Sequence, residues 1–443
     1  MSKKTEKTGV NMSAKSFITA IIVIFTLMVL TYGLTFIIPG GGIPFWKWAL
    51  SPILVLTADG NVSLIAVILF LLVIGGVFNC LDKCGLMKYM LDMITSRFGK
   101  ERYKLLSIVT LFFMAMGSFI GSFEEAVPLV PIVVALAIRL GWDSLVGLGM
   151  SMLAIGCGFA AGVCNPFTVG VAQELAGLPM FSGMGFRMVS FVCIYLLLLT
   201  FLSLYAKKVE KPLGDDVAQQ VFKKDENMTR GLKCFGGLMC GGILIVLSSV
   251  VFPVLQDFTM IIVALTFLVA GIVSTRMSGR GGNIWKTFLN GVMSVLPGVI
   301  MILMANSIKY TLEEGNILNT ILQGMLAIAQ TLPGWAIVLF IYLIVLVMNF
   351  FISSGSAKAF LLMPLIVPLA EPFGISAQLC VMAFAFGDGF SNVFYPTNPV
   401  LLIGLGLADV DYGTWAKWSW KFQAINIMLS SVLLLIGLAI GYA

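Results

Sequence analysis

The chain has 443 residues, of which 59% are hydrophobic and 11% charged, and its formal net charge is +6. This composition excludes a soluble globular protein and predicts a polytopic membrane protein, and the modest positive charge needs no nucleic-acid partner to explain it. The chain contains no histidine, so any proton coupling has to use Asp or Glu, and its eight scattered cysteines predict neither a disulfide framework nor a metal site.

The chain begins with two apolar runs and a basic amphipathic stretch. Residues 17–38 and 62–82 are each long enough to cross a hydrocarbon core of about 30 Å at about 1.5 Å per residue. The first run is too long for a signal-peptide core, so we expect a retained span. The stretch GLMKYMLDMITSRFGKERYK that follows is typical of a helix lying on the cytoplasmic membrane surface.

A hairpin and a broken helix are predicted next. The two arms of residues 103–140 are short for spans and positively charged at both outer ends, which predicts a re-entrant hairpin with GSFEEA at its tip. The segment 144–179 is longer than one span needs and contains CNPFTVG. Pro166 removes a backbone donor and disfavours helix at Asn165, so the helix should break there. A span at 188–206 then leads to a long hydrophilic stretch.

The second half of the chain repeats the first. The offset of 233 residues also aligns GSFEEA with SGSAKA, so that Lys358 stands where Glu125 stands in the first half. This alignment predicts a second hairpin at about 333–373 and a second broken helix at about 376–410. At that offset an ungapped alignment pairs Pro131 with Pro364, Gly141 with Gly374, Gly156 with Gly389, Asn165 with Asn398 and Pro166 with Pro399.

The predicted fold class is an all-α polytopic membrane protein with an inverted repeat, about nine spans, two opposed re-entrant hairpins and two broken helices, as in secondary transporters. Lys and Arg gather in the loops that this topology places on one side, which predicts insertion in the inner (cytoplasmic) membrane with the N-terminus in the cytoplasm and the C-terminus outside. The predicted units are a first inverted repeat at 1–206, a cytoplasmic loop at 207–232, a connecting span at 233–256 and a second inverted repeat at 257–443.

The two hairpin tips and the two helix breaks should meet near the membrane midplane, where half-helix ends offer unpaired backbone groups. Glu124 and Glu125 at the first tip are therefore predicted to belong to a binding site, because an ionisable residue inside a membrane is a functional candidate by default. The alternative is a solvated loop between two short spans. Which glutamate faces the site stays open, since neighbours at a helix end point about 100° apart.

The helix breaks carry uncharged oxygens. Asn165 and Thr168 at the first break, and Thr397 and Asn398 at the second, suit a sodium ion, while backbone N–H groups there suit a substrate carboxylate. A simple kink at each Asn-Pro pair is the alternative.

Three more polar residues accompany the second repeat. Asp388 and Asn392 lie one turn apart before the second break and are candidate ligands of a coupling ion, although Asp388 could instead pair with a neighbouring helix. Lys358 at the second tip either snorkels outward or lies opposite Glu125 as a counter-ion or carboxylate receptor.

Several runs of the chain resemble the anaerobic C4-dicarboxylate carrier family, in particular its YfcC-like branch within the ion transporter superfamily. These runs are SFEEAVPLVPI, NPFTVGVAQELAGLP, SSGSAKAFLLMPLIVPLA, FGDGFSN and YPTNPVLLIGLGL, and the resemblance extends over about residues 20–440. It implies a secondary carrier, commonly a homodimer, whose hairpins and broken helices move against a scaffold in an elevator-type motion. Members are associated with dicarboxylates and with amino acids such as arginine exchanged for ornithine.

The resemblance and the residue patterns together define the predicted site. For the substrate the residues are Ser122, Glu124, Glu125, Asn165, Thr168, Ser354, Ser356, Lys358, Thr397 and Asn398. For a coupling ion, either sodium or a proton, they are Asn165, Asp388, Asn392 and Asn398.

The charges at the predicted site favour a substrate that bears both signs. Two neighbouring carboxylates would oppose a dicarboxylate, which ordinarily binds to Arg or to several N–H donors. We therefore expect secondary active transport of a small carboxylate-bearing solute, an amino acid, by alternating access with ion coupling or exchange. A dicarboxylate carrier and a sodium/proton exchanger without organic substrate are the alternatives. No nucleophile is paired with a base, so we expect no enzyme, and the only cofactor we expect is sodium. The expected partners are the substrate and the lipid bilayer, and the family resemblance implies a second copy of the chain.

Overall fold

The computed structural model describes residues 14–37, 42–58, 62–98, 101–121, 123, 127, 129–212, 224–248, 259–329 and 331–443. Within these residues every regular element is helical, and eight helices are long and apolar enough to cross a membrane. The prediction of an all-α polytopic membrane protein is therefore confirmed.

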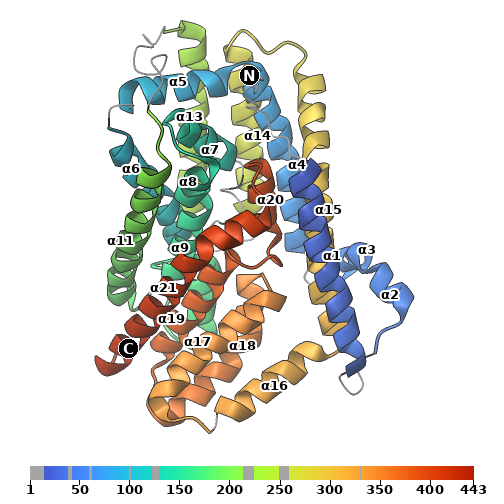
Figure 1. Cartoon of the computed structure of the whole chain (residues 1–443), viewed down its shortest axis with the longest axis vertical. Coiled ribbons are helices and arrows are strands. Elements are labelled where there is room, and N and C mark those ends of the chain that lie inside the picture. Colours follow the sequence, from blue (N-terminus) through green and yellow to red (C-terminus); the bar gives the residue numbers. More distant parts are fainter. Residues whose placement is uncertain are drawn as a thin grey trace.

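The first helices follow the predicted apolar runs. The helices α1 (Ala14–Ile37) and α4 (Val62–Lys83) cover the first two runs, and the short helices α2 (Phe45–Ala49) and α3 (Ser51–Leu54) lie between them. The amphipathic α5 (Leu86–Phe98) lies across one end of the molecule (Figure 1).

The first hairpin segment and the first broken segment come next. The arms at 103–140 are α6 (Arg102–Ala115), extended by a π-helical turn, and α7 (Val130–Arg139). The broken segment comprises α8 (Ser144–Leu148), a π-helical turn, α9 (Ala154–Ala161) and, after the interruption, α10 (Val171–Leu175). The long apolar helix α11 (Met184–Val209) follows.

The second half has a matching order of helices. Before it lies α13 (Glu226–Ser248), at the place of the predicted connecting span. It starts earlier than the expected 233, because the Asp225 carboxylate accepts hydrogen bonds from the backbone N–H of Asn227 at 3.0 Å and Met228 at 3.2 Å and so caps the helix. The other helices are α14 (Thr259–Met277), α15 (Ile284–Glu314), α16 (Ile317–Ala329), α17 (Gly334–Phe351), α18 (Gly355–Ala370), α19 (Ala377–Asn392), α20 (Pro399–Leu407) and α21 (Tyr412–Ala439).

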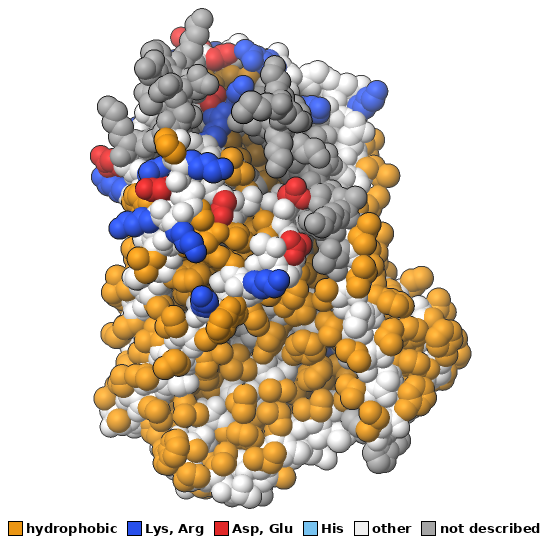
Figure 2. Space-filling model, viewed as in Figure 1, with side chains coloured by type: hydrophobic (Ala, Val, Ile, Leu, Met, Phe, Trp, Pro, Cys, Tyr) orange, Lys and Arg blue, Asp and Glu red, His pale blue; other side chains and the backbone are white. Residues whose placement is uncertain are grey.

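The two hairpin segments enter the molecule from opposite ends. In Figure 1 α6 and α7 lie toward the upper end, beside α5, whereas α17 and α18 lie toward the lower end, beside α16. Figure 2 shows Lys and Arg side chains gathered toward the α5 end on this face, while the lower half is mostly hydrophobic. A polar end above a hydrophobic body is the surface that a bilayer requires.

The first halves of the two broken helices, α9 and α19, cross in close contact. A Cβ atom at Gly156 would lie 2.3 Å from a methyl group of Val393, and one at Gly389 would lie 2.3 Å from the backbone nitrogen of Ala160. Both Gly156 and Gly389, and Ala160 and Val393, are separated by 233 residues. The two contacts are therefore reciprocal, as a pseudo-two-fold axis requires, and small residues let the two backbones approach.

The buried apolar side chains form two clusters. The smaller cluster lies between α4, α5, α13 and α14 and includes Phe78, Phe235 and Phe267. The larger cluster joins the two hairpin segments and the two broken segments to α1, α15 and α16, and it includes Ile155, Phe386 and Trp415. The helices that carry the predicted site thus share one core, and part of the remaining bundle has another.

Candidate functional site

Both broken segments are interrupted at their Asn-Pro pairs. After α9 the backbone turns at Gly162, whose φ of +45° is accessible to glycine at little cost, and the side-chain oxygen of Asn165 then accepts a hydrogen bond from the backbone N–H of Thr168 at 3.2 Å. After α19, Asn398 does the same for α20, accepting from Val400 N–H at 2.9 Å and Leu401 N–H at 3.3 Å. Each Asn therefore caps a new half-helix that begins with proline, which a simple kink would not need.

The carbonyl groups freed at the two breaks are bound by side chains from α11 and α21. At the first break, the Arg187 guanidinium donates to the carbonyl of Val163 from Nε at 3.3 Å and from Nη2 at 3.2 Å. At the second, the indole of Trp415 donates to the Val393 carbonyl at 2.9 Å. At each break, one freed carbonyl is therefore hydrogen-bonded within the protein.

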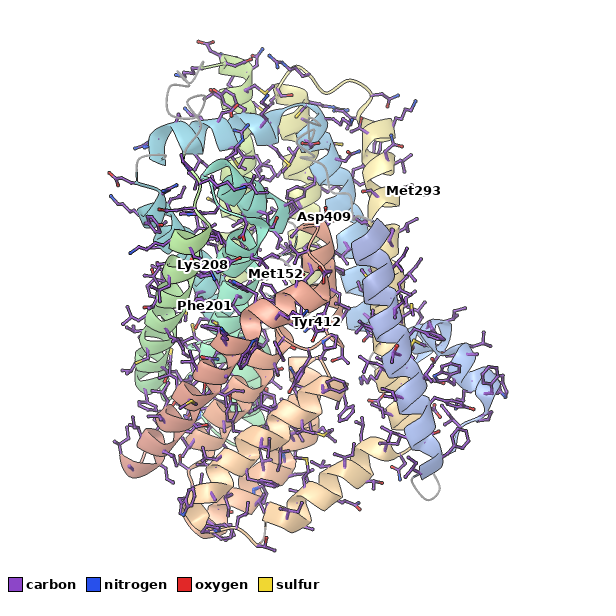
Figure 3. All side chains as sticks on the ribbon, viewed as in Figure 1. Met152, Phe201, Lys208, Met293, Asp409 and Tyr412 are labelled. Carbon is purple, nitrogen blue, oxygen red and sulfur yellow. The ribbon has the colours of Figure 1, made fainter. Side chains whose placement is uncertain are left out.

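The hydroxyl of Tyr412 adds a second bond at the second break. Tyr412, labelled in Figure 3 at the start of α21, donates to the carbonyl of Phe394 at 3.0 Å. The start of α21 is thereby fixed to the segment between α19 and α20.

The first hairpin tip touches the first break. Gly121 has a φ of +76°, and a Cβ atom there would lie 2.1 Å from the side-chain oxygen of Asn165. Ser118, just before it, accepts hydrogen bonds from Val163 N–H at 3.0 Å and from Cys164 N–H at 3.2 Å. Of the predicted tip residues, Ser122, Glu124 and Glu125 lie outside the described residues, so their roles stay predictions.

The second hairpin tip meets the first break and the second broken helix. Ser354 caps α18 by accepting from Ala357 N–H at 3.5 Å, and Ser356 lies in the first turn of that helix. A Cβ atom at Gly355 would lie 2.4 Å from the Thr168 methyl group and 2.6 Å from Oδ2 of Asp388. The glycine therefore lets elements of both halves converge.

A buried ion pair lies directly behind this tip. Nζ of Lys358 is 2.6 Å from Oδ1 of Asp388, and both side chains are 0% exposed. The same ammonium donates to the side-chain oxygen of Asn349 and, at 3.1 Å, to the carbonyl of Ile352. An ammonium has three N–H donors, so all of them are used and the side chain does not snorkel outward.

Amide side chains extend the pair into a network. The amide nitrogen of Asn349 donates to Ser391 Oγ at 2.6 Å and to Asn392 Oδ1 at 3.1 Å. Asn392 donates to Asp388 Oδ1 at 3.3 Å, and Asn398 donates to Asn392 Oδ1 at 2.9 Å. Three of the residues predicted for a coupling ion are therefore joined, and Asn349 is a member that the sequence analysis missed.

Three residues of the network have apolar counterparts in the first half. At the offset of 233 residues, Asn349, Asp388 and Asn392 correspond to Met116, Ile155 and Phe159. These three are apolar, so the first repeat has no equivalent of this network at those positions. The two halves are alike in fold and different in chemistry.

Three polar atoms near the tips have no hydrogen-bond partner among the described residues. They are Oγ1 of Thr168, Oδ2 of Asp388 and Oγ1 of Thr397, all on buried side chains. Buried polar atoms are rarely left unpaired, so these three atoms are candidates for contact with a bound molecule.

Arg187 forms a second buried polar cluster, which the sequence analysis also missed. Besides Val163 it donates to the Ser182 carbonyl at 2.8 Å, to Oε1 of Gln378 at 3.3 Å and to the Tyr442 hydroxyl at 3.2 Å. Every N–H group of the guanidinium has an acceptor, so Arg187 is a structural residue in this conformation.

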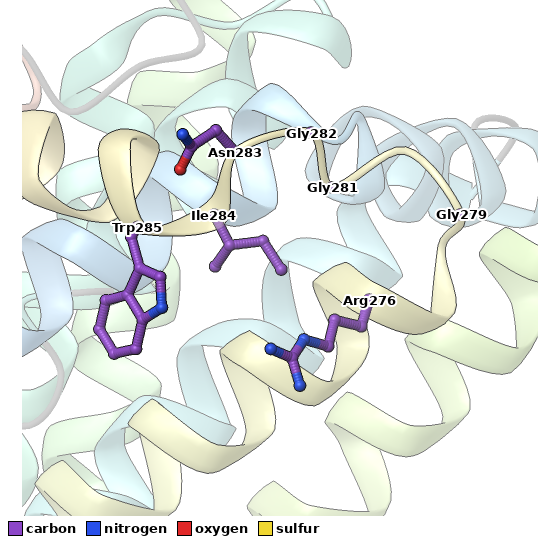
Figure 4. A pocket seen from close by; sticks show the side chains of 7 residues that line it. All are labelled: Arg276, Gly279, Gly281, Gly282, Asn283, Ile284 and Trp285. Atoms are coloured by element: carbon purple, nitrogen blue, oxygen red, sulfur yellow. The ribbon is translucent and has the colours of Figure 1, made fainter.

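Two other kinds of site were considered, a metal site and a surface pocket. No group of three or more His, Cys, Asp or Glu side chains that could hold a metal ion occurs within the described ranges. A surface pocket of about 450 Å³ lies at the turn between α14 and α15, lined by Arg276, Asn283 and Trp285 among others (Figure 4). No residue of the predicted site lines it.

One family model and two relatives in sequence match most of the chain. The family model described as "C4-dicarboxylate anaerobic carrier" matches residues 48–439. A protein of Escherichia coli K12 named "Putative basic amino acid antiporter YfcC" is 33% identical over 406 residues, covering 85% of this chain and 78% of its own length. An uncharacterized protein of Haemophilus influenzae is 25% identical over 394 residues, covering 85% of this chain and 76% of its own.

A solved structure, that of the YdaH transporter of Alcanivorax borkumensis, aligns with 95% of this chain and 98% of its own at 18% identity. The TM-score is 0.49.

Proposed function

The chain belongs to the C4-dicarboxylate anaerobic carrier family, and we propose that this secondary transporter exchanges amino acids that bear a carboxylate and a cationic group. The observation that carries the proposal is the convergence at Gly355, where the second hairpin tip meets Thr168 of the first break and Asp388 of the second broken helix. Elements from both halves that meet at a glycine are suited to enclose a small solute between them.

The proposed charges fit a mixed-charge substrate. The N–H groups of Gly355 and Ser356 open the 16-residue helix α18, and such a helix N-terminus attracts a carboxylate. Glu124 or Glu125 at the first tip would bind the ammonium or guanidinium group. The name of the Escherichia coli relative also describes basic amino acid antiport.

A dicarboxylate substrate is the second candidate, because the family model bears that description. Two neighbouring glutamates oppose it, and Lys358 is already neutralised by Asp388 at 2.6 Å. The proposal therefore prefers an amino acid over a dicarboxylate.

We further propose an elevator-type motion, insertion in the cytoplasmic membrane with the α5 end facing the cytoplasm, and a homodimer. In support of the motion, α13 and α14 belong to a different apolar cluster from the helices around the site, whereas α1 and α15 contribute to the same cluster as those helices. The charge distribution in Figure 2 supports the orientation.

Counterflow in proteoliposomes tests the substrate. Vesicles loaded with unlabelled arginine should accumulate labelled arginine, and competition by amino acids should exceed competition by succinate. Glu125→Gln should abolish this exchange, whereas Glu371→Gln, at an exposed position at the base of the second hairpin segment, should not. Unchanged exchange in Glu125→Gln would remove that glutamate from the site, and counterflow driven by dicarboxylates alone would establish the second candidate.

A further inference from the structure

We propose that Lys358 is a tethered cation, whose ammonium occupies a site built for a monovalent cation, so that the second hairpin works without sodium. This inference goes beyond the proposed function, because it concerns ion coupling and not the substrate.

The surroundings of the ammonium are those of a cation site. Its three acceptors are oxygens of three kinds: a carboxylate oxygen of Asp388, an amide oxygen of Asn349 and the backbone carbonyl of Ile352. Oxygen ligands of this kind bind hard cations. Ile352 is the C-cap residue directly after the end of α17, so its carbonyl lies close to the negative end of that helix dipole.

The elements that provide these oxygens are the ones that would have to close around an ion. Asn349 and Ile352 belong to the end of one hairpin arm, Lys358 to the start of the other, and Asp388 to the second broken helix. The ammonium thus connects the tip of the hairpin to the broken helix by a group that is covalently part of the chain. Its side chain is 0% exposed.

A sodium ion and this ammonium exclude each other. Asp388 supplies one negative charge, and Lys358 neutralises it at 2.6 Å, so an added metal ion would place two positive charges on one carboxylate. The carbonyls of Val393 and Phe394, freed by the second break, are already bound by Trp415 and Tyr412. Two of the oxygens that could complete a metal site at this break are therefore already in use.

A permanently bound cation has a consequence for transport that rests on the proposed function. Lys358 and Asp388 cancel each other's charge, so the second tip carries no net charge whether substrate is present or absent. The proposed glutamates of the first tip would then be without a cation only when the carrier is empty. Moving such an uncompensated charge through the membrane is costly. The carrier would then return only with a second cationic substrate, which makes exchange obligatory.

The test is thermal unfolding of the purified protein in sodium chloride, potassium chloride and choline chloride at equal ionic strength. The wild type should show no saturable shift with sodium. Lys358→Ala should unfold at a lower temperature, and sodium or methylammonium should raise its unfolding midpoint saturably, because a ligand that binds the folded state stabilises it by mass action. The double variant Lys358→Ala/Asp388→Asn should lose this response.

Two results would overturn the inference. One is a saturable stabilisation of the wild type by sodium, with potassium and choline inert. The other is a folded Lys358→Ala variant that responds to neither cation. If that variant cannot be purified, wild-type counterflow in sodium-free medium decides: full exchange supports the tethered cation, and loss of exchange refutes it. Because unfolding needs no substrate, a wrong substrate would leave the cation result intact.

Discussion

The crossing of α9 and α19 predicts a large penalty for Gly389→Ala. The new methyl carbon would lie 2.3 Å from the backbone nitrogen and 2.4 Å from the Cα of Ala160, where ordinary contact begins near 3.4 Å. Backbone cannot rotate aside, so one helix has to shift by about 1 Å in a close-packed core. We expect the free energy of unfolding to fall by about 3 kcal/mol, at the upper end of the range for overpacked cores.

Two other glycines provide matched comparisons. At the reciprocal position, Gly156→Ala would contact methyl groups of Val393, which can change rotamer, so the loss should be about 1 kcal/mol. In Gly298→Ala on α15 the nearest atom, a carbon of Ile403, is 3.5 Å away, and this variant should be neutral or more stable by about 0.5 kcal/mol. Unfolding midpoints of the three variants in one detergent give the ranking. A Gly389→Ala midpoint equal to that of Gly298→Ala would refute the reasoning.

Three further changes have defined outcomes. Asp388→Asn should lower the free energy of unfolding by about 3 kcal/mol, because Lys358 loses its opposite charge. The double variant Asp388→Asn/Lys358→Met should recover most of that loss. Additive losses in a thermal double-mutant cycle would contradict the interaction of the two residues. Asn398→Ala should lower the free energy of unfolding by about 1 kcal/mol, because the cap of α20 is lost, and Asn398→Ser should lower it less. Unfolding midpoints measure both effects. Arg187→Lys should lower the midpoint markedly, since lysine offers three donors where arginine uses five; a midpoint like wild type would refute a role in holding the first break.

The breaks and the repeat could be predicted from sequence because their causes are local. An Asn-Pro pair fixes where a helix ends and the next begins, whatever surrounds it. The constant offset between Gly156 and Gly389 likewise indicated two equivalent helices, and in the structure these residues lie in the reciprocal contact of α9 with α19. Helix ends were less predictable, since α13 starts at Glu226 only because Asp225 caps it.

The partners of the charged groups could not be predicted, because they depend on the rotation of one helix against another. Asp388 and Lys358 lie on different helices, and the sequence left both a structural pair and an ion site open for the aspartate. Asn349 is a single amide in the apolar run of α17, where a polar residue is the signal that marks a buried network. Arg187 immediately precedes the predicted span 188–206, a position typical of an interfacial anchor, yet its side chain is 0% exposed.

The position of Lys358 changes what the glutamates of the first tip require. Aligned with Glu125 by the repeat, it could have been the counter-ion of that residue, but its three N–H donors are used within the second half. In the proposed site, a carboxylate pair at the first tip would then need a positive charge from elsewhere. A substrate that brings its own cationic group meets this need, whereas a dicarboxylate increases it. The asymmetry between two halves of the same fold is therefore the reason to expect that the carrier selects by charge.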